Sequence, residues 1–366
     1  MNERVNVAVL MGGRTAEHEI SVASGKKVVE NLDLTKYNVK PVTITREGLW
    51  LVPKGYLTEG ATVAELLAKN FACDTEGNEL APVEIGAALS RTASERVQVV
   101  FIAMHGPYGE DGTIQGLLEM LDLPYTGSGV EASAISMNKI RTKEVYIQRG
   151  IPTPKHEVIE ELDWEKNRDS ETARIEKSLG YPCVTKPPRL GSSVAIAIAA
   201  DRESFASAVD DALRYDTSVL VEEFIPGREL TSPVLGNGPS KEPTALALVE
   251  IVPKTSEYFD YEAKYTPGAS EEIAPAPVSE EIARETKRLG LLAHKALGCS
   301  GLSRTDMILN GKSLSVLETN TIPGLTDVSL FPKAAEATGL SFPRLLDHLL
   351  SVAIETHRSK KICVDR

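Results

Sequence analysis

The sequence predicts an α/β protein of two or three domains, on three grounds. Its 366 residues are more than one hydrophobic core usually organises. Apolar runs with strand character alternate with stretches of helical periodicity, which is the pattern of α/β architecture. Two of the apolar runs end in glycine-rich polar segments, at residues 12–13 and 105–112, and open α/β sheets hold their ligand loops at such strand ends.

The composition excludes several classes of protein. Apolar residues make up 42% of the chain and charged residues 25%, as in an ordinary globular enzyme. A net charge of −12 argues against nucleic-acid binding, because phosphate contacts need a basic face. No apolar run is long enough to span a bilayer, and no signal peptide is expected. The cysteines lack metal or CxxC spacing and indicate reduced thiols in a cytoplasmic protein: Cys73, Cys183, Cys299 and Cys363.

The first unit is a strand over residues 5–10, a Gly-Gly turn and a helix that contains Val22, Val28 and Leu32. The turn lacks the G-x-G-x-x-G spacing of a dinucleotide site, so a dehydrogenase is disfavoured. Glu17, beside the turn, would repel a phosphate at the helix N-terminus and suits an ammonium group. The alternative is an exposed helix-start carboxylate, which the helix dipole also favours.

Residues 51–95 are polar and weakly periodic, and no site is predicted there. A buried strand over residues 97–104 then leads into His105 and a glycine-rich loop, followed by a helix over residues 113–123. The strand end places His105 where ligands bind, although a loop-packing histidine is the alternative. Residues 123–129 have the composition of a linker and mark the first domain boundary.

A helix carrying Lys139 and Lys143 comes next, and Pro152 ends it. Alternating apolar residues then predict a hairpin over residues 181–198, with a Gly-Ser-Ser tip and Lys186 on one strand. Such a tip can fold over phosphates while the lysine neutralises them. The segment is not a Walker A sequence, and an ordinary solvated hairpin is the alternative.

After a helix over residues 201–215, a strand at 219–225 becomes a linker whose backbone could contact an adenine edge, with Glu229 as a ribose acceptor. A strand is expected over residues 245–252. Residues 258–268 have the length and composition of an active-site lid. A helix from Ser279, its expected N-cap, to Leu297 precedes the last hairpin.

That last hairpin carries the most informative residues. Glu318 and Asn320 stand two apart on an expected strand, so they present oxygen atoms on one face. Arg304 and Asp306 have the same spacing on the strand before. Because Mg²⁺ usually takes one or two protein carboxylates plus substrate phosphates, the cluster suits a metal-bound nucleotide. A charged, solvated hairpin is the alternative.

The connection between these two strands decides whether the cluster forms. Residues 310–311 predict the turn. A two-residue loop would place Asp306 and Glu318 on opposite faces, whereas a three-residue loop through Lys312 would place them on the same face. We therefore predict an odd-length or bulged connection.

Over essentially its whole length the chain resembles the D-alanine:D-alanine ligases of the ATP-grasp superfamily. Seven blocks occur in the order typical of that family: GGRTAEHEIS, HGPYGEDGT, GSSV, VEEFIPGRE, DYEAKY, SRTDMIL and LETNTIPGLTDVSLFPKAA. The resemblance implies an ATP-grasp fold with an N-terminal Rossmann-like α/β domain. The implied domains are residues 1–128, the central 129–222 and the C-terminal 223–366.

The resemblance also implies a reaction. The γ-phosphoryl of ATP passes to the carboxylate of one D-alanine, and the amine of a second D-alanine attacks the acyl phosphate to form a dipeptide for peptidoglycan synthesis. ATP is a substrate, two Mg²⁺ or Mn²⁺ ions are cofactors, and a cytoplasmic homodimer is expected. Alternatives are a paralogue that uses D-serine or D-lactate as acceptor, and a nucleotide-binding regulator without turnover.

The site residues are carried over by motif. The positions that match ATP contacts are Lys139, Lys186, Ser193, Glu222, Glu223, Ile225, Glu229 and Lys264. The positions that match metal ligands are Asp306, Glu318 and Asn320. The positions that match catalytic or substrate contacts are Glu17, His105, Ser192, Tyr265, Arg304, Gly324, Ser329 and Leu330. Among these, Glu17 matches the ammonium site of the first D-alanine, and Tyr265 favours an amine acceptor over a hydroxy acid.

Three positions depart from the family pattern. Ala195 stands where glycine commonly follows Ser-Ser-Val, which would stiffen the phosphate loop. Pro188 is unusual after Lys186 and Pro187. Pro233 is expected to interrupt a strand that is normally continuous, because proline lacks a ladder donor.

Overall fold

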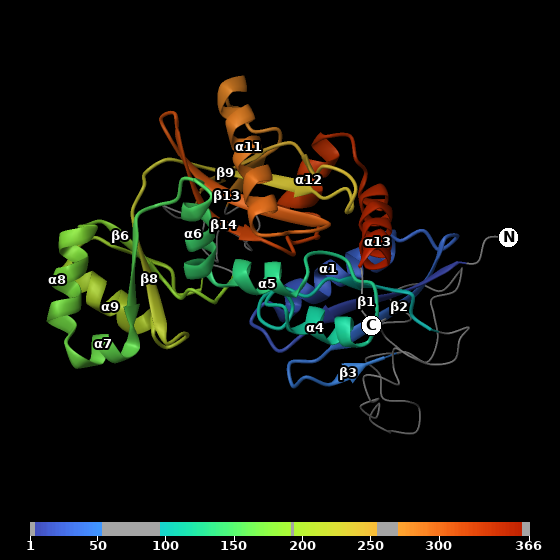
Figure 1. The fold of residues 1–366 in the computed structure, drawn as a ribbon, viewed down its shortest axis with the longest axis horizontal. Coiled ribbons are helices and arrows are strands. Elements are labelled where there is room, and N and C mark those ends of the chain that lie inside the picture. Colours follow the sequence, from blue (N-terminus) through green and yellow to red (C-terminus); the bar gives the residue numbers. More distant parts are fainter. Residues whose placement is uncertain (1–3, 53–95, 192–193, 255–269, 361–366) are drawn as a thin grey trace, which may run out of the picture.

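The structure is a computed structural model that describes residues 4–52, 96–191, 194–254 and 270–360 (Figure 1). Four predicted site residues lie outside the described residues, as do most of residues 51–95 and the predicted lid: Ser192, Ser193, Lys264 and Tyr265. Within the described part of the chain, no helix has both the length and the apolar character needed to cross a membrane.

The N-terminal part is a four-stranded sheet of order β3-β2-β1-β4, with helices on both faces. Its elements are β1 (Val5–Gly12), α1 (His18–Asn31), β2 (Tyr37–Ile44), β3 (Trp50–Leu51), β4 (Val99–Ile102) and α4 (Thr113–Met120). Strands β2 and β4 run parallel to β1. Along β1, Val7 and Val9 pack with α1 on one side, whereas Ala8 and Leu10 face α4 on the other. The three parallel strands β2, β1 and β4, covered by helices on both faces, confirm the predicted α/β unit.

The middle of the chain forms a smaller lobe, seen at the left of Figure 1. Helices α5 (Val130–Met137) and α6 (Lys139–Gln148) lead to it. The lobe has a sheet of order β5-β8-β6-β7 and three helices. Its elements are β5 (His156–Glu160), α7 (Glu161–Lys166), α8 (Arg168–Ser178), β6 (Cys183–Lys186), β7 (Ala197–Ala199), α9 (Arg202–Ala212) and β8 (Ser218–Glu223). The side chains of Trp164, Ile175 and Phe205 fill the space between the helices and the sheet.

The predicted hairpin with a strand-borne lysine is confirmed, because β6 and β7 pair antiparallel and Lys186 ends β6. Its second strand is shorter than predicted. It begins at Ala197 rather than at Val194, since Ala195 has a φ of 55° and cannot continue an extended strand. The glycine commonly found at this position would adopt that backbone conformation without strain.

The C-terminal part holds a six-stranded antiparallel sheet of order β12-β11-β9-β13-β14, with β10 also paired to β9. Its elements are β9 (Arg228–Leu235), β10 (Thr244–Ala245), β11 (Val249–Pro253), β12 (Ser270–Ile273), α11 (Glu280–Ala296), β13 (Leu302–Asn310) and β14 (Ser313–Asn320). Helix α11 packs on this sheet, and the Ser279 hydroxyl accepts from the amide of Ile282, which confirms the predicted N-cap. The strand predicted over residues 245–252 is divided into β10 and β11.

The predicted interruption at Pro233 is wrong. Strand β9 is continuous and central, and Pro233 lies opposite Arg304 of β13. On its other side β9 pairs with β10 and β11, and Pro233 lies where those two short strands are separated. There the Pro233 carbonyl still accepts from the amide of Leu246. Proline lacks a backbone N–H, but at Pro233 this donor would have faced the gap between β10 and β11. Its absence therefore does not interrupt β9.

The bulge predicted for the last hairpin is confirmed. Residues 311–312 form a two-residue connection between Asn310 and Ser313, and the register then shifts beyond Met307. Leu317 is the extra residue, so Asp306 pairs with Glu318. The bulge restores the shared face that a regular two-residue hairpin would have lost.

The chain ends by returning to its beginning. Helices α12 (Leu330–Ala337) and α13 (Phe342–Ser359) follow the β13–β14 hairpin, and α13 lies beside α1 in Figure 1. Leu345, Leu346 and Leu349 of α13 share one core with the N-terminal sheet. This packing brings the segment after β14 against the loop that begins at His105.

Candidate functional site

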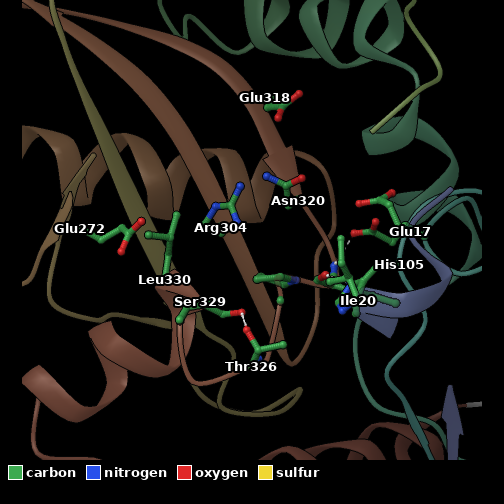
Figure 2. Close-up of a pocket in the computed structure, with 15 residues that line it drawn as sticks. Glu17, Ile20, His105, Glu272, Arg304, Glu318, Asn320, Thr326, Ser329 and Leu330 are labelled. Atoms are coloured by element: carbon green, nitrogen blue, oxygen red, sulfur yellow. Dashed lines mark hydrogen bonds between the residues drawn. The ribbon is translucent and has the colours of Figure 1, made fainter. Parts of the chain in front are cut away.

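Two clefts meet at the carboxylate of Glu318, which lines both. Each holds about 830 Å³ of space when the open solvent at its mouth is included. The first, which we call the substrate cleft, lies between the N-terminal loops and the segment from β14 to α12 (Figure 2). The second, which we call the nucleotide cleft, lies between the small lobe and the large sheet.

The predicted metal residues share one face of the hairpin. Arg304 makes two hydrogen bonds to the Asp306 carboxylate, of 2.8 Å and 2.6 Å, and the Asn320 amide donates a third of 3.1 Å. The Thr231 hydroxyl, from β9, donates to the same carboxylate at 2.7 Å. Asp306 is thus buried and fixed in orientation, as a ligand on a rigid strand should be.

These residues fit magnesium that arrives with a nucleotide. Asp306 and Glu318 supply carboxylates and Asn320 an amide oxygen, which are the hard ligands that Mg²⁺ prefers. Within the described residues no group of three or more His, Cys, Asp or Glu side chains could hold a metal ion. The donor set is therefore suited to an ion that completes its coordination with phosphate oxygens and water.

Lys139 connects the metal face to the phosphate loop. Its ammonium donates to the carbonyl of Leu190 at 2.9 Å and lies 3.1 Å from a Glu318 carboxylate oxygen. The Lys139 side chain is buried. Lys139 is the first residue of α6, and Asn138 is the N-cap of that helix. A cation held between the Leu190 carbonyl and the Glu318 carboxylate is well placed to neutralise phosphates.

The nucleotide cleft has apolar walls and a charged end. The walls come from the small lobe and from the hairpin: Val184, Ile196, Ile198, Phe224, Ile308 and Leu317. At the charged end, the buried Glu222 carboxylate forms ion pairs with Lys186 and with Lys143 of α6. Burial acts to raise the pKa of Glu222, but the two lysine charges outweigh it and hold the pKa at about 2.

The other predicted nucleotide residues are at the same cleft. Glu223, Ile225 and Glu229 all line it. The Glu223 carboxylate accepts from the Lys155 amide at 2.8 Å, and its own amide donates to the Lys155 carbonyl. Glu223 therefore ties the linker to the segment before β5 as well as lining the cleft.

Glu17 lines the substrate cleft and lies beside two glycines. A methyl group built on Gly106 would come within 2.4 Å of Glu17 Oε2, and one built on Gly191 within 2.9 Å. Gly106 has a φ of 72°, a conformation that favours glycine. The carboxylate thus occupies space that only glycines leave, at the start of α1, and it lines the substrate cleft.

His105 lines the substrate cleft, but both ring nitrogens contact protein. Nδ1 lies 3.1 Å from the carbonyl oxygen of Ile322, which can only accept, so Nδ1 carries the proton. Nε2 then accepts from the Ser24 hydroxyl at 2.8 Å, and that hydroxyl in turn accepts from the Leu325 amide at 3.3 Å. Burial lowers the pKa of His105, which favours this neutral form. His105 and Ser24 together hold the segment that contains Gly324.

The remaining predicted residues form the far wall of the substrate cleft. Ser329 is the N-cap of α12, and its hydroxyl is 2.7 Å from that of Thr326 instead of capping the helix (Figure 2). The backbone of Gly324 lies against Ser329, since a methyl group there would come within 2.7 Å of the hydroxyl. The amide of Leu330 is at the helix N-terminus, where carboxylates bind favourably.

Models of two families match the chain, namely the D-ala D-ala ligase N-terminus over residues 6–128 and the D-ala D-ala ligase C-terminus over residues 145–351. The chain belongs to the D-alanine:D-alanine ligase family. Among its relatives, the D-alanine–D-alanine ligase of Geobacillus thermodenitrificans is 40% identical over 98% of each chain. That of Desulforudis audaxviator is 42% identical over 95% of this chain and 98% of the relative.

Solved structures of the ligase family share the fold. The D-alanine–D-alanine ligase of Coxiella burnetii matches with a TM-score of 0.80 at 32% identity, covering 97% of this chain and 95% of that one. A D-Ala:D-Ser ligase of Enterococcus faecalis matches with a TM-score of 0.79 at 32% identity, over 96% of this chain and all of that one. The predicted ATP-grasp fold is thereby confirmed.

Sequence reasoning missed Glu110, a residue of the substrate cleft. Glu110 lines it, and its carboxylate accepts from the amides of Gly106 at 2.7 Å and Ile322 at 3.2 Å. Burial, and then the charge of Glu17, raise the pKa of Glu110 to about 8. Glu110 stands inside the quoted HGPYGEDGT block, but nothing in that block indicates that its carboxylate turns inward.

Proposed function

We propose that this chain joins two D-alanines to D-alanyl-D-alanine in an ATP-dependent reaction that proceeds through an acyl phosphate and supplies peptidoglycan synthesis. The observation that carries the proposal is the continuity of the two clefts through Glu318. Asp306 and Lys186 line the nucleotide cleft, whereas Glu17, Arg304 and Leu330 line the substrate cleft. A carboxylate in the substrate cleft would therefore lie next to the γ-phosphate of a nucleotide in the other.

On the nucleotide side, the apolar walls would hold adenine and Glu229 would accept from the ribose. Lys139 and Lys186 would bind phosphates, together with Ser193 and Lys264. Asp306, Glu318 and Asn320 would hold two Mg²⁺ ions, which would supply positive charge to offset that of the phosphates. The ion pair of Lys139 with Glu318 supports this assignment, because a phosphate could replace the carboxylate beside the lysine and a Mg²⁺ ion could replace the lysine beside the carboxylate.

On the substrate side, Glu17 would pair with the ammonium group of the first D-alanine, whose carboxylate takes the phosphoryl group. The second D-alanine would place its carboxylate at the Ser329 hydroxyl and the Leu330 amide. Its amine, once deprotonated, forms the C–N bond. Arg304 and the Gly324 amide would then stabilise the negative oxygen of the tetrahedral intermediate, which expels phosphate.

The second amino acid is the part of the proposal that needs a direct test. The purified protein is supplied with Mg²⁺ and ATP, and with D-alanine, L-alanine, D-serine or D-lactate, each alone and with D-alanine. ADP release with D-alanine alone, and a D-alanyl-D-alanine mass, are the expected results. Release only when D-serine or D-lactate is added would favour the alternative acceptor, and nucleotide binding without turnover would favour a regulator.

Two substitutions test separate parts of the site. Asp306→Asn should reduce phosphoryl transfer sharply, and near-normal activity would rule out Asp306 as a metal ligand.

Tyr265→Phe should raise the KM for D-alanine and leave ATP binding nearly intact, because Tyr265 is proposed to link the lid to Ser192 and Glu17. An unchanged KM would remove that link.

The organisation of the chain is also proposed. Domains of residues 1–128, 129–222 and 223–366 are supported by the three sheets, whose strands fall within these ranges to within one residue. We also propose that the chain is a cytoplasmic homodimer, as the resemblance to the family implies. Light scattering of the purified chain tests the dimer.

A further inference from the structure

Lys143 is a buried cation to which the proposed function gives no role. Its side chain is completely buried, and it is not among the described residues that line the nucleotide cleft. The ammonium group forms an ion pair with Glu222 and donates to the Thr153 hydroxyl at 2.6 Å. Thr153 in turn donates to the carbonyl of Val316 on β14 at 2.7 Å. Lys143 is therefore held in place from behind the cleft.

The Glu222 carboxylate is shared between two lysines that differ in their access to ligands. Oε2 contacts Lys186, which lines the cleft, and Oε1 contacts Lys143, which does not. A nucleotide phosphate that attracts Lys186 would leave Glu222 with only the inner lysine. A buried carboxylate without a cation is unfavourable and takes up a proton. Lys143 is placed to prevent this.

Glu222 also presents a hydrogen-bond acceptor to the cleft. Its Oε1 is enclosed and contacts Lys143, whereas Oε2 contacts Lys186, which lines the cleft. A carboxylate oxygen can accept from more than one donor, so Oε2 can also accept from a donor on a ligand. Glu222 itself lines the cleft beside Phe224 and Ile225. The exocyclic amino group of adenine is such a donor. Guanine has a carbonyl at that position, and a carboxylate would repel it.

We propose that Lys143 is a positioning residue for adenine recognition, which keeps Glu222 anionic and oriented toward the amino group of the base without touching the nucleotide. This inference rests on the proposed function, because it takes ATP as the ligand of the nucleotide cleft. Beyond that function, the inference assigns to Lys143 the role of setting the preference for adenine.

The test compares two nucleotides that differ only in the amino group. Calorimetry with the full-length protein and Mg²⁺ gives the affinities for ATP and for purine riboside 5′-triphosphate, which lacks that group. The ratio of the two affinities is the readout, because a general loss of folding or of phosphate binding lowers both affinities and leaves the ratio unchanged. In Lys143→Met the ratio should fall about 10-fold, as expected for one hydrogen bond to a charged group.

Three further variants complete the design. Glu222→Gln should lower the ratio to the same extent, and Lys143→Met with Glu222→Gln should lower it no further, since both act through one carboxylate. Lys177→Met, which removes an exposed lysine of α8, should leave the ratio unchanged.

Two results would overturn the inference. One is a wild-type ratio near unity, and the other is an unchanged ratio in Lys143→Met. The proposed function is judged separately by dipeptide formation. A wild-type protein that makes dipeptide without preferring ATP contradicts only the role of Lys143, whereas a preference for ATP without dipeptide contradicts only the ligase reaction.

Discussion

Replacing Gly106 by alanine should displace the carboxylate that we assign to the first D-alanine. The new methyl group would lie 2.4 Å from Glu17 Oε2, so the carboxylate must move by about 1 Å to reach ordinary contact. A displacement of that size typically costs a catalytic site about 100-fold. We therefore expect kcat/KM for D-alanine to fall about 100-fold, while the Kd for ATP changes less than about threefold.

The backbone strain of the same substitution can be measured separately. Gly298 has a φ of 70°, against 72° for Gly106, and a methyl group built there meets nothing within 4 Å. Gly298→Ala thus carries the same strain, about 1–2 kcal/mol, without the contact to Glu17. Steady-state kinetics and urea unfolding of both variants separate the two effects. If kcat/KM of Gly106→Ala stayed within threefold of that of Gly298→Ala, the placement of the ammonium site would be wrong.

Three other predictions concern the residues around the clefts. Ser24→Ala leaves a buried imidazole acceptor unpaired, so urea unfolding should show a loss of about 2 kcal/mol, well above that of Ser133→Ala, which removes only a 3.5 Å contact. The pKa of Glu110 is raised on folding to about 8, so its contribution to stability falls as the pH rises from 4.5 to about 8. Glu110→Gln should remove that slope from unfolding curves taken across this window, whereas the exposed Glu131→Gln should keep it. Ala195→Gly should relieve the strain of a φ of 55° and raise the free energy of unfolding by about 0.5–1 kcal/mol, and a lower value would contradict the strain.

The sequence predicted best what depends on local spacing. Asp306 and Glu318 share a face because side chains alternate along each strand and one bulge shifts the pairing between the two strands. The structure has both features. Glu17 is buried at the cleft, so the alternative of an exposed helix-start carboxylate is wrong, and its role as an ammonium site stays a prediction. Such inferences need no knowledge of tertiary contacts.

What the sequence could not predict depends on segments that meet only in the fold. Lys143 of α6 contacts Glu222 of β8, and no spacing rule indicates a contact between residues so far apart in the sequence. The cost expected at Pro233 was overestimated, since the break between β10 and β11 can be seen only in the assembled sheet. His105 was placed correctly at a strand end, but its hydrogen bonds to Ser24 and Ile322 come from helices and loops distant in sequence.

The most direct test of the central claim follows an oxygen atom. The protein is incubated with Mg²⁺, ATP and D-alanine labelled with ¹⁸O in its carboxylate, and the phosphate and dipeptide are analysed by mass spectrometry. If the carboxylate attacks the γ-phosphate and is then displaced by an amine, one labelled oxygen should appear in phosphate for each D-alanyl-D-alanine formed. Dipeptide with unlabelled phosphate would exclude the acyl phosphate, and the absence of dipeptide would contradict the ligase reaction.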